Sequence, residues 1–218
     1  FYDEVVPLTD RERDEYRKLP GTEAEFMHSV SVTGMFGESG YSAIERRWAR
    51  PTFDINGLTS GYQGEGAKTV LPAKASAKFS FRLVPNQDPT KITNGLRKFL
   101  EERLPPGIQM ELVDHHGAPG VMVALESPYM TAAAAAIESA FGRAPVMIRE
   151  GGSIPIVNTF ADELGADVLL LGWGQNDDNT HSPNEKFSLV DYHRGTLASA
   201  ALWEQIAKLS PTEKTKKK

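Results

Sequence analysis

Hydrophobic residues alternate with polar ones along residues 74–84. The apolar positions of this segment, KASAKFSFRLV, are Ala75, Ala77, Phe79, Phe81 and Leu83. Because successive side chains of a strand point to opposite faces, this period of two predicts a strand with one buried face. Arg82 is then on the polar face, together with Lys78 and Ser80.

Two further stretches of the N-terminal part have strand-like patterns. Residues 52–62, TFDINGLTSGY, are typical of a strand followed by a turn, and residues 108–113, IQMELV, alternate again. The N-terminal part is therefore predicted to be α+β, with a small antiparallel sheet and helices on one of its faces.

Helical spacing is found on both sides of the predicted strands. Residues 88–104 carry an apolar stripe made of Ile92, Leu96, Phe99, Leu100 and Leu104. Asp88 is expected to cap this helix, and Pro89 to occupy its first position, where a missing N–H leaves no helical bond unmade. A shorter charged helix is predicted over residues 9–18, with Thr9 or Asp10 as its N-cap.

The pattern changes near residue 122, beyond which helices and short apolar runs alternate. Helices are predicted over residues 127–142, 153–165 and 188–209, and strands over residues 145–148 and 166–172. The second of these strands, ADVLLLG, is apolar throughout, as expected of a strand buried on both faces. Strand–helix alternation predicts a parallel α/β arrangement. The whole chain is therefore assigned to the α/β class, with an α+β N-terminal part.

Capping residues mark the ends of the helices in this second part. Ser127 is the expected N-cap of the first helix, Pro128 follows at the first helical position, and Gly142 is the expected stop. Ser188 and Asp191 have the spacing of a capping box at the start of the last helix.

Composition narrows the range of functions. The chain has 218 residues, and its net charge of -5 argues against a nucleic-acid-binding surface. It has no cysteine, which excludes disulfides, thiolate metal ligands and thiol catalysis. No apolar run approaches the length of a membrane span. We therefore expect a cytoplasmic protein that binds neither nucleic acid nor membrane.

The two ends of the chain differ in composition. The chain opens with FYDEVVPL, which has no Met and no basic region of the kind that begins a signal peptide, as expected of a processed product or a fragment. Residues 211–218 include the basic run KTKKK and are predicted to be a disordered tail.

Two polar loops each follow a predicted strand of the C-terminal part. They are REGGS, residues 149–153, and GQNDDNTHSPNEKF, residues 174–187. Ligands of α/β sheets bind beyond the carboxyl ends of the strands, so both loops are candidate sites. Gly151 and Gly152 permit close backbone approach, and Ser153 opens a helix whose free N–H groups favour an anion. A plain capped turn would have the same sequence.

His181 lies in the middle of the second loop, among several carboxylates. Hydrolytic zinc sites need about three protein ligands and one open position. The chain has five histidines, but no HExxH motif and no other close spacing of metal ligands. Spacing alone leaves two interpretations of His181 open: a metal ligand, or a structural or exposed histidine.

Four segments together resemble one family of metallopeptidases. They are RRWARPTFDINGL, GEGAKTVLPAKASAKFSFRLVPNQDP, REGGSIPI and NTHSPNEKF, which occur in this order. They are similar to the carnosinase-like dipeptidases of the aminoacylase/carboxypeptidase group, which use two metal ions. Members of this family have a catalytic α/β domain interrupted by a lid domain that dimerises. The resemblance implies that residues 1–122 are most of a lid, and residues 123–210 the C-terminal part of a catalytic domain.

The same resemblance implies roles for particular residues. His181 would be the last metal ligand of the family. Arg82 would hold the carboxylate of the substrate, a role that suits the planar guanidinium fork. The implied substrate-binding residues are Arg82, Thr69, Ser153, Gly152, Glu150 and His181.

The family takes its other metal ligands and its general base from an N-terminal part that has no counterpart in this sequence. The resemblance therefore implies the C-terminal portion of a dipeptidase that uses zinc or manganese to hydrolyse short peptides. The lid would form a homodimer. We expect no catalytic residue in this chain, at most one metal ligand, and no activity in isolation. The alternative is a non-catalytic binding or dimerisation module built on residues 74–114.

Overall fold

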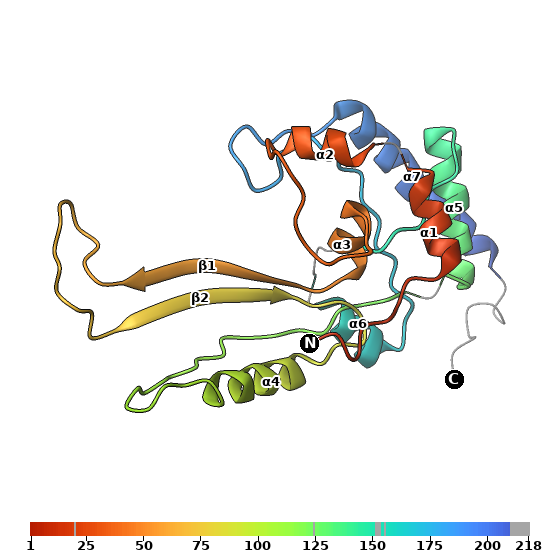
Figure 1. Ribbon diagram of the computed structural model, residues 1–218. Coiled ribbons are helices and arrows are strands. Elements are labelled where there is room, and N and C mark those ends of the chain that lie inside the picture. The colour runs from red at the N-terminus through yellow and green to blue at the C-terminus, as the bar shows by residue number, and fades with distance from the viewer. Residues whose placement is uncertain (20, 124, 151–153, 155, 210–218) are drawn as a thin grey trace. The chain divides into compact units, whose positions relative to one another are not determined.

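Two units make up the chain, and each is described by itself. The computed structural model describes residues 1–19, 21–123, 125–150, 154 and 156–209 (Figure 1). The first unit contains Phe1–Val121 and the described residues of Ile148–Pro155. The second contains Met122–Met147 and the described residues from Ile156 onward. The tail predicted for residues 211–218 lies outside the described residues.

Three short helices begin the first unit, and a capping box starts each of them. They are α1 (Asp10–Arg17), α2 (Glu23–Ser29) and α3 (Ala43–Ala49). Helix α1 begins after Thr9, as predicted. The sequence interpretation missed α2 and α3, because helices of seven residues are too short to show an apolar stripe.

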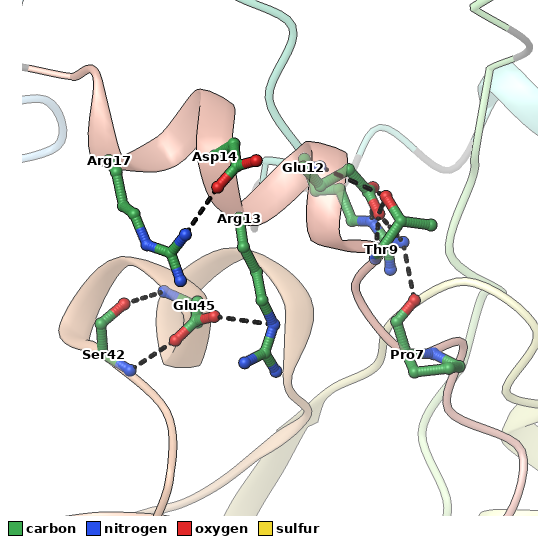
Figure 2. Close-up of polar contacts among 9 residues, drawn as sticks. Pro7, Thr9, Glu12, Arg13, Asp14, Arg17, Ser42 and Glu45 are labelled. Carbon is green, nitrogen blue, oxygen red and sulfur yellow. Dashed lines mark hydrogen bonds and ion pairs between the residues drawn. The ribbon is translucent and has the colours of Figure 1, made fainter.

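Helix α1 packs on α3 through one aromatic contact and one ion pair. Tyr16 is 5% exposed, and its ring meets that of Trp48 edge-on at 5.3 Å. Arg13 Nε lies 3.4 Å from a carboxylate oxygen of Glu45, as Figure 2 shows. These contacts make the small core of the helical part of this unit.

The predicted strands around residues 52–62 and 74–84 are confirmed. Strands β1 (Thr52–Ser60) and β2 (Ala75–Arg82) form an antiparallel hairpin, with Thr52 opposite Arg82 at one end and Ser60 opposite Ala75 at the other. Phe79 and Phe81 are half-buried between exposed neighbours, as the alternation predicts. Ala75 and Ala77, nearer the loop, are exposed.

Helix α4 (Pro89–Glu101) follows β2 and begins as predicted. The Asp88 side chain accepts from the N–H groups of Thr90 and Lys91, and Pro89 occupies the first turn. Most of its apolar stripe is half-buried, Phe99 is 52% exposed, and no residue of this helix is fully buried.

The strand predicted for residues 108–113 is absent. Within the described chain, the sheet consists of β1 and β2 only. Side chains of α4 hold the segment instead: Arg97 donates to the carbonyl of Leu112, and Thr93 to the carboxylate of Asp114. A strand needs a neighbouring strand for its backbone bonds, and these contacts go to a helix.

The described residues of the second unit form three helices: α5 (Pro128–Phe141), α6 (Ile156–Leu164) and α7 (Leu189–Lys208). Ser127 caps α5, and Gly142 ends it at a φ of 73°, as predicted. The side chain of Ser188 caps α7 by accepting from the Asp191 N–H. The reciprocal half of the expected capping box is missing, because the Asp191 carboxylate accepts from Gln175 instead.

Helices α5 and α7 pack closely because small residues line their contact. The buried positions are Ala132, Ala133, Ala136, Gly195 and Ala198. The ring of Trp173 stacks on that of Phe141, with centroids 5.5 Å apart. A Cβ atom built on Gly195 would lie 2.7 Å from atoms of the Trp173 ring. The absence of a side chain at Gly195 therefore leaves the space on α7 that the Trp173 ring occupies.

The strands predicted for residues 145–148 and 166–172 are also absent from the described structure. Neither segment has regular secondary structure, and Leu170 and Leu171 are 51% and 36% exposed. Apolar composition identified segments suited to a buried strand. A strand still requires an adjacent strand, and the second unit has none among its described residues. None of the described helices is long and apolar enough to cross a membrane.

Gly195→Ala should lower the free energy of unfolding by about 1–2 kcal/mol, although alanine is the better helix former, because the added methyl group forces the Trp173 ring to move. The matched control is Gly95→Ala in α4, where a Cβ atom meets nothing within 4 Å. There we expect a gain of roughly 0.5–1 kcal/mol. Thermal unfolding of the two variants measures both effects, and equal changes would contradict this packing.

Candidate functional site

Arg82, the residue implied to bind a carboxylate, is the last residue of β2. It lies opposite Thr52 in the sheet and is exposed, as are Lys78 and Ser80 on the same face of the strand. The rings of Phe1 and Phe53 contact Phe81 at 5.5 and 5.1 Å. The aromatic cluster therefore fixes the strand end on one face and leaves the guanidinium on the other.

Thr69 lies at the other end of the hairpin. It is exposed in the loop of residues 61–74, which Figure 1 shows extending beyond the strand ends. From Ala75 to Arg82 the strand advances by seven residues, a span of roughly 23 Å. Within one chain, the structure therefore does not bring Thr69 and Arg82 together.

The segment that precedes Gly151 and Gly152 is held to α1 by Arg149. Its Nε and Nη2 atoms donate to the two carboxylate oxygens of Glu12, at 2.7 and 3.0 Å. Its Nη1 and Nη2 atoms donate to the carbonyls of Val6 and Pro7, at 2.9 and 3.2 Å. Its backbone N–H donates to the hydroxyl of Tyr16 at 3.1 Å. Figure 2 shows Glu12 and Pro7 at this position beside α1.

Glu12 serves both the cap of α1 and this arginine. One of its carboxylate oxygens accepts from the N–H and the hydroxyl of Thr9, each at 2.8 Å. Burial raises the pKa of Glu12, but the hydrogen bonds from Arg149 and Thr9 outweigh it and leave this pKa below 4.5. The carboxylate therefore stabilises the fold above pH 4.5, and the contribution is lost as the pH falls through the lowered pKa. Burial raises the pKa of the Tyr16 phenol.

Glu150 follows Arg149 directly and is exposed. It shares the first unit with Arg82 and Thr69. Gly152 and Ser153, the other residues implied for this turn, lie outside the described residues.

His181 belongs to the second unit, in the loop between residue 173 and α7. It is exposed, and its φ of 61° is left-handed, which is uncommon for a residue with a side chain. Asn179 and Asn184 have similar values, 54° and 61°. A backbone hydrogen bond closes the loop, in which the Lys186 N–H donates to the carbonyl of Asp178 at 2.9 Å. His181 is thus part of a tight loop with defined backbone turns.

Asp178 is the buried residue that organises this loop. It is 3% exposed, and its carboxylate accepts from the Gln175 N–H at 2.7 Å. The ammonium of Lys186 lies 3.4 Å from Asp178 and 3.0 Å from Asp177. The side-chain amide of Gln175 donates to the Asp191 carboxylate at 2.6 Å and so joins the loop to α7.

The donor set around His181 fits one position of a metal site. No group of three His, Asp or Glu side chains that could hold an ion occurs in the part of the chain that the structure describes. A single imidazole on a constrained loop suits one ligand to a divalent ion, and a complete site needs about three. The residues described here therefore do not complete such a site.

Sequence reasoning missed Arg149 and Asp178. Both lie inside the two loops that the sequence identifies as candidate sites. Their roles depend on burial and on partners distant in sequence, since Glu12 is 137 residues away from Arg149. Only the tertiary contacts distinguish them from neighbouring charged residues.

Comparisons with known proteins place the chain in a family. Residues 8–108 match the peptidase dimerisation domain, and residues 59–205 match peptidase family M20/M25/M40. The chain is 36% identical to the Cys-Gly metallodipeptidase DUG1 of Candida albicans, over 89% of this chain and 41% of that protein. It is 31% identical to the Beta-Ala-His dipeptidase of Homo sapiens, over 96% of this chain and 42% of that protein.

Similarity to solved structures agrees with this family assignment. The M20 family metallo-carboxypeptidase Sso-CP2 of Sulfolobus solfataricus has a TM-score of 0.80 at 30% identity, covering 96% of this chain and 48% of that one. The chain belongs to peptidase family M20/M25/M40, which confirms both the resemblance and the α/β class. It spans about two fifths of the length of the curated relatives described above.

Asp178→Ala should lower the free energy of unfolding by about 1–3 kcal/mol, because the Gln175 N–H loses a charged acceptor. Asp177→Ala is the matched control, since the side chain of Asp177 is 75% exposed and pairs only with Lys186 at the surface. Hydrogen exchange of the Gln175 backbone N–H should be faster in Asp178→Ala and unchanged in Asp177→Ala. Unchanged exchange in both would remove Asp178 as the organiser of the His181 loop.

Proposed function

We propose that this chain is the C-terminal portion of a two-metal dipeptidase that hydrolyses short peptides. The observation that carries the proposal is its similarity, over 89% and 96% of its length, to two proteins named as dipeptidases. That similarity reaches only 41% and 42% of those proteins. A preceding part would supply the remaining ligands and the general base. Exposed apolar residues such as Leu170 and Leu171 support contact with such a part.

In this proposal, His181 supplies one metal ligand from its loop. The left-handed turns and the buried Asp178 support the role, because they limit the positions that the imidazole can take. Zinc or manganese ions, when bound, would supply an activated water and polarise the peptide carbonyl.

Arg82 holds the C-terminal carboxylate of the substrate. Its exposed position at the end of β2 and the fork geometry of guanidinium support this role. A terminal carboxylate held at a fixed place selects peptides whose scissile bond lies close to their C-terminus. Glu150, Ser153 and Gly152 would contact the substrate from the loop of residues 149–153, and Thr69 from the hairpin loop.

The first unit would form a homodimer. Residues 8–108 match a dimerisation domain, and the hairpin exposes apolar side chains that suit a second copy. Phe53, Ile55 and Leu58 are 49%, 58% and 70% exposed. These values also favour the second candidate function, a non-catalytic dimerisation module, because exposed apolar surface of this kind commonly marks an interface.

Arg82→Ala in the full-length enzyme should lower kcat/KM for dipeptides by roughly 10–100-fold, since hydrogen bonds to a charged group contribute about 1.5–3 kcal/mol. Lys78→Ala is the matched control, because Lys78 is a cation on the same face of β2, four residues before Arg82. We expect little change there. Small and equal effects would remove Arg82 from the site.

The isolated chain should neither hydrolyse dipeptides nor bind zinc tightly. A calorimetric zinc titration of this chain beside its His181→Ala variant should show weak or absent binding in both. Tight binding that disappears in the variant, together with turnover, would mean that the chain builds a complete site. A full-length protein without any hydrolytic activity would favour the dimerisation module.

A further inference from the structure

The Arg149 side chain makes more hydrogen bonds than an arginine at the protein surface would require. Its guanidinium donates four hydrogen bonds, two to Glu12 and one each to the carbonyls of Val6 and Pro7. The side chain is 11% exposed, and that of Glu12 is 21% exposed. A cation withdrawn from water in this way is stable only where its partners are fixed. The segment 148–150 is therefore held firmly to α1.

The geometry requires arginine in particular. The two bonds to Glu12 use the parallel fork of the guanidinium, while Nη1 and Nη2 reach two successive backbone carbonyls. A lysine ammonium carries the same charge on a single nitrogen and cannot reproduce this pattern. Arg149→Lys therefore changes the geometry of the contact while it keeps the charge.

The same N-terminal segment that Arg149 binds also lies against the end of β2. The carbonyl of Phe1 accepts from the Gln87 side chain at 2.7 Å, and the Phe1 ring contacts Phe81. The Asn86 amide donates to the carbonyl of Glu4 at 3.0 Å. Residues 1–7 thus contact Arg149 at one end and the neighbourhood of Arg82 at the other.

We infer that Arg149 is a positioning residue for substrate binding. It fixes Glu150 in the same unit as Arg82, with residues 1–7 as the common support, so that two substrate contacts keep a constant relation. It acts through Glu150 and does not touch the substrate itself. The inference rests on the proposed function, because Glu150 and Arg82 are substrate contacts only in that proposal.

Hydrogen exchange of the full-length protein tests the anchor without any assay of activity. In Arg149→Lys, the amides of residues 148–150 and the first turn of α1 should exchange faster, by about tenfold or more. Glu12→Gln keeps the size of the side chain and should have the same effect. Arg17→Lys is the matched control, since Arg17 is on the same helix and pairs with Asp14 at the exposed surface. It should leave exchange unchanged.

Steady-state kinetics then separate positioning from a general loss of stability. Arg149→Lys should raise KM for dipeptides about tenfold and change kcat by less than about threefold, because binding geometry is disturbed and the reacting groups are not. Because the effect passes through Glu150, adding Arg149→Lys to Glu150→Gln should change KM by less than about threefold. A purely structural role would instead lower the active fraction, and so kcat, equally in both backgrounds.

Each result decides a different point. Faster exchange with a raised KM that is absent in the Glu150→Gln background supports the inference. Unchanged exchange overturns the anchor, whatever the kinetics show. Faster exchange with an unchanged KM, or an equal KM change in both backgrounds, overturns the positioning role. A full-length protein that hydrolyses no dipeptide would refute the proposed function, and the exchange data would still report on the anchor.

Discussion

The contact between Arg149 and Glu12 is the constraint on which the first unit depends. It withdraws a cation and a carboxylate from water, and such a pair is stable only when further hydrogen bonds accompany the ion pair. The carbonyls of Val6 and Pro7 and the cap of α1 meet that condition. One arginine thereby joins the start of the chain, the first helix and a segment more than a hundred residues later in sequence.

The second unit depends on close helix packing rather than on charge. Alanines and Gly195 let α5 and α7 approach each other, and Trp173 fills the remaining space against Phe141. The loop that follows Trp173 is tied to α7 through Gln175 and Asp191. The packing of α7 thus sets where the His181 loop begins and ends, and the buried Asp178 sets its internal shape.

The proposed dipeptidase function gives these local arrangements a common purpose. In that proposal, the first unit contributes a guanidinium and a carboxylate, and the second an imidazole. Neither unit contains a complete set of metal ligands among its described residues. The chain spans about two fifths of the length of its relatives, and its supporting residues are as informative as its candidate ligands.

The sequence by itself determined the local elements. Caps at Thr9, Asp88 and Ser127 fixed helix starts because their side chains bond to N–H groups within three residues, and period two identified β2. Motif residues also identified the family. Only the tertiary structure decided whether the apolar runs at 108–113 and 166–172 become strands, since a strand requires a neighbour that its own residues do not encode. It alone also revealed Arg149 and Asp178, because burial and distant partners, not residue type, give a charged side chain its role.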